Sequence, residues 1–153
     1  FLLLNKNLKK FFNSQNINGP KRVYFKRSGN LTRQIKNIGE IENKLRIMNF
    51  EFIDPLDYTV DDLAEKLNNV ETLIMQGGSA FANIIYLTKP AHILLMVIDH
   101  PRSLYHTFSN LAYVLGHSCS FLFGDSILNN NHKKDNTHDD FKINLDLLND
   151  IPN

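Results

Sequence analysis

The feature that most constrains the fold is an uninterrupted apolar run at residues 93–98, Ile-Leu-Leu-Met-Val-Ile. A strand with one solvated face alternates apolar and polar residues, so a run without polar positions indicates a strand buried on both faces. Strands of this kind occur in parallel sheets that carry helices on both sides. The run therefore predicts the interior of a parallel sheet.

Short β-type runs alternate with amphipathic helical segments along the rest of the chain. Strands are predicted at residues 23–25, 50–53, 73–75, 93–98 and 119–123, the last as an edge strand. Helices are predicted at residues 38–48, 80–87 and 103–115, and another, capped by Thr59 or Asp61, runs to Leu67. A short helix could place Leu3, Leu4, Leu8, Phe11 and Phe12 on one face. The alternation predicts an α/β fold, a Rossmann-like parallel sheet with helices on both faces and right-handed crossovers.

Length and composition favour a single domain with its own core. The chain has 153 residues, of which 42% are hydrophobic. We expect a linker or helix at residues 1–20 and a Rossmann-like domain at residues 21–124. Residues 125–153 are expected to hold a mobile loop, at 129–136, and a segment that docks onto the body. Because the chain starts at Phe1 rather than Met, we expect it to be a piece of a longer protein.

Charge and cysteine content exclude several classes of protein. A net charge of +1 does not predict a basic face for nucleic acid. The single cysteine, Cys119, rules out an internal disulfide framework and a cysteine-based zinc cluster. No segment reaches the roughly 18–20 continuous apolar residues of a membrane span. We therefore expect a cytoplasmic protein with no nucleic-acid partner and no membrane span in this chain.

Residues 73–83 combine a predicted strand, a glycine turn and a predicted helix. Gly77 and Gly78 let the backbone come close to a ligand, and the first N–H groups of a helix suit a phosphate. Ser79 can cap that helix or donate to an anion. Taken alone, the turn slightly favours a structural interpretation. Its position at the carboxyl end of a central strand favours binding, because open α/β sheets bind ligands along that edge.

A basic loop follows the first predicted strand. Its cations are Lys26, Arg27, Arg33 and Lys36. In a parallel sheet this loop lies on the same edge as the glycine turn, and the planar fork of arginine matches phosphate oxygens. Such a loop alone is more commonly a solvated surface. Two such loops on one edge favour a phosphate-bearing ligand.

The histidines give one further candidate. His100 follows the strand at residues 93–98 and so is expected near the proposed site, as a binding or proton-transfer residue. A hydrogen-bonded loop histidine is the alternative. His132 and His138 form a loose cluster with Asp135, Asp139 and Asp140, but its spacing argues against a specific metal site. We therefore predict no bound metal.

Familiar catalytic motifs are missing from the sequence. There is no G-x-S-x-G elbow, no G-x-x-x-x-G-K-[ST] loop, no H-E-x-x-H and no G-x-G-x-x-G. The last absence counts against a nicotinamide or flavin cofactor, and no cofactor is predicted.

Four blocks of residues, taken together, carry a resemblance to a known family. They are Arg27-Ser28 with Arg33, Asn37 and Glu40; residues 49–56 with the helix that ends at Leu67; residues 78–86; and residues 111–117. In this order and spacing they resemble the carboxyl-terminal half of family 61 glycosyltransferases, over about residues 21–123. The block around Asn83 is the most specific. The family includes capsular-polysaccharide enzymes and xylosyl- and N-acetylglucosaminyltransferases.

The resemblance implies a GT-B architecture of two Rossmann-like lobes, in which the second lobe holds most of the nucleotide-sugar donor. It also implies an inverting reaction without a bound metal. This chain would be the donor-binding lobe, and its partner would be a missing N-terminal lobe. By position, Arg27 and Arg33 would face the donor phosphates, and Gly78, Ser79 and Asn83 would belong to the glycine-rich signature.

Two departures from the family pattern bear on activity. The family usually has a histidine directly before the signature glycine, where this chain has Gly77. It usually has an acidic residue near the end of the next strand, where residues 94–98 are wholly apolar and Asp99 comes late. The departures fit either a divergent donor or a lobe that binds without catalysing.

The sequence thus predicts a donor-binding portion of a glycosyltransferase. The enzyme would move a sugar from a nucleotide diphosphate sugar to a glycan or other hydroxyl acceptor. The alternative is a non-catalytic Rossmann-like module that binds a nucleotide or a protein. The predicted nucleotide-sugar site comprises Arg27, Ser28, Arg33, Gln76, Gly77, Gly78, Ser79, Asn83 and His100.

Overall fold

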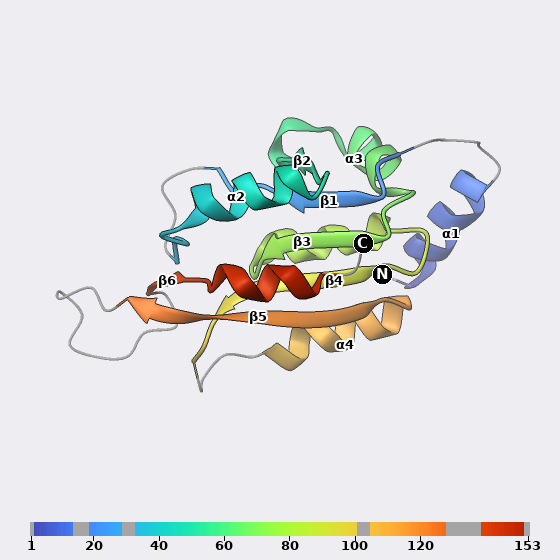
Figure 1. Ribbon diagram of the computed structural model, residues 1–153. Helices are drawn as coiled ribbons and strands as arrows, with labels where there is room; N and C mark the ends of the chain where they lie inside the picture. The colour runs from blue at the N-terminus through green and yellow to red at the C-terminus, as the bar shows by residue number, and fades with distance from the viewer. Residues whose placement is uncertain (1, 14–18, 29–32, 101–104, 128–138, 152–153) are drawn as a thin grey trace.

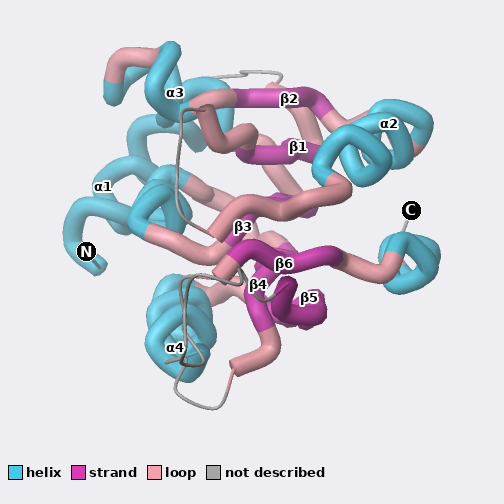
Figure 2. The backbone as a smooth tube through the Cα atoms, turned by 90° about the vertical axis from the view of Figure 1, so that its left-hand side faces the viewer, coloured by secondary structure: helices cyan, strands magenta, loops and turns pink. Residues whose placement is uncertain are grey.

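The computed structural model describes residues 2–13, 19–28, 33–100, 105–127 and 139–151, which form a sheet between two helical layers (Figures 1 and 2). The strands are β1 (Arg22–Phe25), β2 (Glu51–Ile53), β3 (Thr72–Gln76), β4 (His92–Ile98), β5 (Ser118–Ile127) and β6 (Asp140–Lys142). The α-helices are α1 (Leu2–Asn13), α2 (Ile38–Ile47), α3 (Val60–Leu67) and α4 (Tyr105–Leu115). The 3-10 helices are η1 (Pro55–Asp57), η2 (Ser79–Tyr86) and η3 (Leu145–Asp150).

The sheet has the strand order β2-β1-β3-β4-β5-β6. Strands β1 to β5 are parallel, and β6 runs antiparallel to β5. Phe25 pairs with Met75, which in turn pairs with Leu95, so the carboxyl ends of β1, β3 and β4 lie along one edge. The predicted Rossmann-like α/β fold is confirmed.

Each face of the sheet has its own core because side chains alternate along the strands. On β4, Ile93, Leu95 and Val97 pack into one core with residues of α3, η2 and α4. Leu94, Met96 and Ile98 pack into a second core with residues of α2 and of the C-terminal segment, which we define as residues 139–151. The expectation that residues 93–98 are buried on both faces is confirmed.

The handedness of the crossovers explains which helix covers which face. The chain moves from β1 to β2 in one direction through α2, and then steps in the other direction through α3, η2 and α4. Right-handed crossovers in opposite directions place their helices on opposite faces. Figure 2 shows α3 and α4 on one side of the sheet and α2 on the other. The second face of β4 and β5 is consequently left to the C-terminal segment, whose Leu148 is fully buried there.

The predicted fifth strand is present, but it is longer than residues 119–123 and is not the last strand of the sheet. Strand β5 continues to Ile127, and β6 pairs with its last residues from Asp125 onward. At Gly124 an added Cβ would lie 2.5 Å from the ring of Phe141, so glycine allows the C-terminal segment to approach β5 closely. The predicted mobile loop at residues 129–136 and the first predicted residues of the 103–115 helix lie outside the described residues.

The predicted N-terminal helix is present as α1, but its buried face differs from the apolar one expected. Leu3, Leu4 and Phe11 are exposed, whereas Asn5 and Phe12 are buried. The Asn5 amide donates to the backbone carbonyls of Ile85 at 2.7 Å and Leu87 at 3.0 Å. A polar side chain therefore docks α1, because the end of η2 exposes carbonyls that need donors.

His117 lies at the edge of the sheet opposite the carboxyl ends of the strands. Its Nδ1 accepts a hydrogen bond from the Ala91 N–H at 3.3 Å, and the residue is buried. Burial, together with the nearby charge of Lys9, lowers the pKa of His117 to about 4. The folded chain therefore holds this imidazole neutral.

We predict that His117 makes the fold sensitive to acid. Between its unfolded pKa of about 6.5 and its folded pKa of about 4, the unfolded chain binds more protons than the folded chain, so stability falls as pH decreases through this window. Thermal melting of wild type and His117→Gln from pH 7.5 to pH 4.5 should show a shallower decline in the variant. Parallel profiles would contradict the assignment.

Candidate functional site

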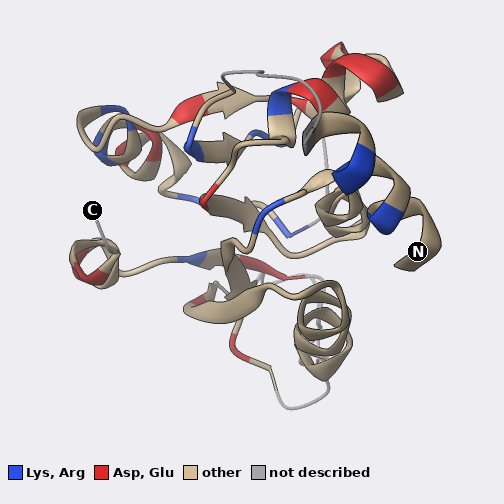
Figure 3. Cartoon of the chain, turned by 90° about the vertical axis from the view of Figure 1, so that its right-hand side faces the viewer, with Lys and Arg blue, Asp and Glu red and all other residues tan. Residues whose placement is uncertain are grey.

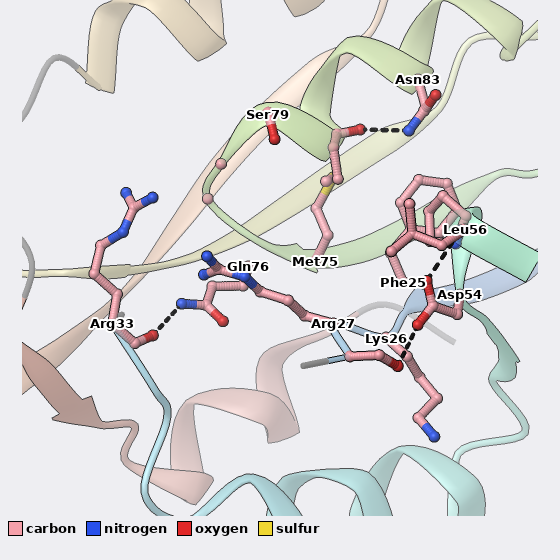
Figure 4. Close-up of a pocket in the computed structure, with 15 residues that line it drawn as sticks. Phe25, Lys26, Arg27, Arg33, Asp54, Leu56, Met75, Gln76, Ser79 and Asn83 are labelled. Carbon is pink, nitrogen blue, oxygen red and sulfur yellow. Dashed lines mark hydrogen bonds between the residues drawn. The ribbon is translucent and has the colours of Figure 1, made fainter. Parts of the chain in front are cut away.

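A pocket lies where the strand order reverses. The chain steps from β1 outward to β2 and then returns to β3 on the other side of β1. The loops that follow β1 and β3 therefore diverge at the carboxyl edge, and open α/β sheets bind ligands in the crevice at such a switch point. The pocket has a volume of about 420 Å³ and is lined by residues that follow β1, β2 and β3 (Figure 4).

Eight of the nine predicted site residues line this pocket. They are Arg27, Ser28, Arg33, Gln76, Gly77, Gly78, Ser79 and Asn83. His100 does not line it. His100 follows β4, one strand farther along the sheet; it is buried, and its backbone N–H donates to the Tyr105 hydroxyl at 3.1 Å. The structure thus separates His100 from the other eight residues, whose role in binding stays a prediction.

Two arginines extend toward the same end of the pocket, on the side of Gln76 (Figure 4). Partial burial lowers the pKa of Arg27 below its ordinary value, and the charge of Arg33 lowers it as well. Among the described residues, no carboxylate forms an ion pair with either guanidinium. The Nε of Arg33 is buried and has no hydrogen-bond partner within the described part of the chain. This end of the pocket therefore offers charge and donors to an anion.

The backbone of Arg33 is left-handed, with φ at 63°. This conformation is uncommon for a residue with a side chain and persists where neighbouring contacts hold it. The Arg33 carbonyl accepts a hydrogen bond from the Gln76 side-chain amide. Gln76 therefore joins the wall that follows β3 to the wall that follows β1.

Asp54 provides the carboxylate of the pocket, at the end away from the two arginines (Figure 4). It is buried, and it accepts hydrogen bonds from the Ser28 hydroxyl and from the Leu56 N–H at 3.0 Å. The predicted site omitted Asp54 and its neighbours Pro55 and Leu56. Their position directly after β2 was the available signal, because every parallel strand delivers its following residues to the same edge.

The glycine turn is shaped by close packing rather than by positive φ. The Gly77 N–H donates to the Met96 carbonyl at 3.0 Å, and a Cβ on Gly77 would lie 2.8 Å from Cγ1 of Val97. Gly78 is extended, with φ at 166°, and a Cβ there would meet no atom within 4 Å. The first glycine is therefore needed for contact with β4, whereas the second is open toward the pocket.

The helix after the turn differs from the prediction in two ways. Residues 79–86 form the 3-10 helix η2 rather than an α-helix, and its N-cap is Gly78, so the expected capping by Ser79 is wrong. The Asn83 side-chain amide donates to the Ala80 carbonyl at 3.0 Å, which competes for an acceptor that an α-helix would pair with residue 84. The two arginines therefore suit an anion better than this helix terminus does.

Within the described ranges, no group of three or more His, Cys, Asp or Glu side chains is arranged to hold a metal ion. Of the loose cluster noted in the sequence, His132, His138 and Asp135 lie outside those ranges. None of the helices formed by the described residues has the length and apolar character to cross a membrane.

Comparison with protein-family models identifies the family of the chain. The sequence model of a family described as Glycosyltransferase 61 matches residues 1–94, more than half of the 153 residues. This range includes every residue that lines the pocket. The match begins before residues 21–123, where the resemblance lies, and ends within them. No curated protein matches the chain at a significant level.

We predict that alanine substitution lowers the stability of the fold at Gly77 but not at Gly78. Gly77→Ala should destabilise the fold by about 1–3 kcal/mol, because the new methyl group overpacks against Val97. Gly78→Ala should change stability by less than about 0.5 kcal/mol, because its position is extended and open. Urea unfolding of the two variants measures the difference. Equal losses in both would refute this account of the turn.

Proposed function

Because the chain belongs to glycosyltransferase family 61, we propose that it forms the donor-binding portion of an enzyme that transfers a sugar from a nucleotide diphosphate sugar. The observation that carries the proposal is the pair Arg27 and Arg33 at one end of a switch-point pocket. A diphosphate is the part of such a donor that two neighbouring guanidinium groups fit best.

The character of the pocket changes along its length, which suits a donor with a charged and an uncharged part. Its volume of about 420 Å³ falls within the range of roughly 300–1,000 Å³ that is usual for small-molecule sites. Phe25, Leu56 and Met75 supply apolar surface for a base or sugar ring. The negatively charged oxygens of a carboxylate accept hydrogen bonds, so Asp54 suits a hydroxyl group of ribose or sugar and disfavours a phosphate.

The mechanism that we propose for this chain is electrostatic. Negative charge grows on the diphosphate as the bond to the sugar breaks, and Arg27 and Arg33 would stabilise that charge through bidentate hydrogen bonds. Both side chains already line the pocket before the ligand binds, so little reorganisation accompanies the reaction. We propose that this chain contributes to the reaction by stabilising the leaving diphosphate.

The acceptor hydroxyl also needs a general base in an inverting reaction. Asp54 is the carboxylate among the residues that line the pocket, and it is buried and hydrogen-bonded to Ser28 and Leu56. We therefore propose that the base comes from another lobe, as a two-lobed GT-B arrangement implies. The isolated chain should bind a nucleotide diphosphate weakly and transfer no sugar, and robust turnover by the chain alone would overturn this proposal.

A non-catalytic nucleotide-binding module is the second candidate. It is favoured by Gly77 and Val97, which stand in contact where the family pattern has polar residues at and near these positions. Both candidates predict binding of uridine diphosphate by calorimetry, and neither survives the absence of heat and of a shift in melting temperature. The candidates differ in one respect: only a transferase releases nucleotide diphosphate from a donor when its complementary lobe is supplied.

We predict that Arg27→Ala weakens binding of uridine diphosphate by about 10-fold or more, because a hydrogen bond to a charged group contributes about 1.5–3 kcal/mol. Arg46→Ala is the matched control. Arg46 is also an arginine, but it lies near the end of α2, where it pairs with Glu42 and does not line the pocket. Calorimetric titration of both variants measures the effect. Unchanged affinity in Arg27→Ala would remove this residue from the site.

A further inference from the structure

The C-terminal segment lies against the connection that carries Arg33. Residues 139–151 fall outside the range matched by the family model, which ends at residue 94. They are more than 100 positions from the connection in sequence, yet β6 runs beside residues 34–36. The Lys36 N–H donates to the Phe141 carbonyl at 2.9 Å, and the Phe141 N–H donates to the Gln34 carbonyl at 3.0 Å. The connection is thus paired with the segment like a short strand.

Asp140 holds the same connection through its side chain. Its carboxylate accepts a hydrogen bond from the Gln34 N–H at 2.7 Å and forms an ion pair with Lys36 at 2.5 Å. These two contacts lower the pKa of Asp140 despite the opposing effect of burial. The carboxylate therefore stays ionised and fastens the residue directly after Arg33.

Asn37 completes the attachment at the start of α2. Its side-chain amide donates to the Ile143 carbonyl at 2.8 Å, and its Oδ1 accepts from the Ile143 N–H at 3.1 Å. Asn37 is buried, so water does not readily replace these bonds. Together with the contacts above, they leave residues 34–37 little freedom to move apart from the C-terminal segment.

Arg33 directly precedes this attachment and has an unusual backbone conformation. Its left-handed backbone costs free energy that surrounding contacts must offset, and its carbonyl is already held by Gln76. With Gln34 fastened on one side and Gln76 on the other, the guanidinium is presented to the pocket before a ligand binds. A side chain that is already in its binding position raises the affinity for the ligand, because less conformational freedom is lost on binding.

We propose that the C-terminal segment is a positioning element of the anion pocket, acting through Asp140 and Asn37 on Arg33. This inference rests on the proposed function, since it assumes that the pocket binds a phosphate-bearing ligand. Neither Asp140 nor Asn37 lines the pocket, so both act through the connection rather than on the ligand.

Asp140 gives a test in which geometry and charge act in opposite directions. Asp140→Ala removes a negative charge near a cationic pocket, and that change alone would tighten anion binding. It also removes the acceptor for the Gln34 N–H, and loss of positioning weakens binding. Asp140→Asn removes the same charge but keeps a side-chain oxygen for that N–H. The proposal requires weaker binding in the alanine variant and rescue in the asparagine variant.

The experiment is calorimetric titration of the chain with inorganic pyrophosphate and with uridine diphosphate. We expect about 3- to 10-fold weaker binding of both ligands by Asp140→Ala and Asn37→Ala, and no weakening by Asp140→Asn. Asn5→Ala is the matched control for Asn37→Ala. Asn5 is also a buried asparagine with two hydrogen bonds to backbone groups, but it docks α1 onto the end of η2, and neither it nor its partners line the pocket. Asn5→Ala should bind as wild type does at temperatures where it is folded.

Hydrogen exchange of the Gln34 and Lys36 amides gives a readout that does not depend on the ligand. Both amides should exchange faster in Asp140→Ala and Asn37→Ala than in Asn5→Ala. Faster exchange with unchanged affinity would overturn the positioning role and leave the proposed function intact. Absence of pyrophosphate and uridine diphosphate binding by wild type would overturn both. Tighter binding by Asp140→Ala would show that its charge outweighs positioning and would also overturn the inference.

Discussion

The single reversal of strand order between β1 and β3 is the constraint on which the rest of the structure depends. Right-handed crossovers place α2 on one face of the sheet and the helices of all later crossovers on the other. Two consequences follow from this one rule. The loops after β1 and β3 separate and leave a pocket, and half of one sheet face has no crossover helix to cover it. The C-terminal segment covers this part of the face. It also lies beside one wall of the pocket, because the uncovered face lies next to the β1–α2 connection.

This geometry gives the C-terminal segment two tasks that are energetically linked. Phe141 and Leu148 are buried against the second face, where each large apolar side chain contributes about 1.5–3 kcal/mol by leaving water. By holding the C-terminal segment on the sheet, the same residues set where Asp140 and Ile143 contact the β1–α2 connection. Core packing therefore sets the position of a polar attachment, and through it, as we propose, the position of Arg33. A pocket on a rigid edge needs such support when its cations stand on a loop.

Much of the fold could be predicted because the sequence states it locally. The apolar run at residues 93–98 gave a strand buried on both faces, and alternation with helical segments gave the parallel sheet. The contacts that could not be predicted join distant residues. The sequence around Asn37 gives no sign of its hydrogen bond to Ile143. Helix α1 docks through the polar Asn5, although an amphipathic helix is expected to dock through its apolar side chains. The fold brings eight of the predicted site residues together in the pocket, but His100 lies one strand away. A position directly after a strand predicts which edge of the sheet a residue reaches, but it does not predict which strands are adjacent there.

The close approach of Gly77 and Val97 bears on how the proposed binding and the acid–base chemistry of the family relate in this chain. The family pattern has a histidine at the first position and an acidic residue near the second, on the next strand. Here a Cβ at residue 77 would lie 2.8 Å from Val97, so a histidine would not fit, and it would find apolar neighbours on β4. A buried imidazole without a partner is costly, so glycine at position 77 suits an apolar residue at position 97. The arginines stand on a different connection and are held by different contacts. We therefore propose that anion binding does not depend on a polar pair at these two positions.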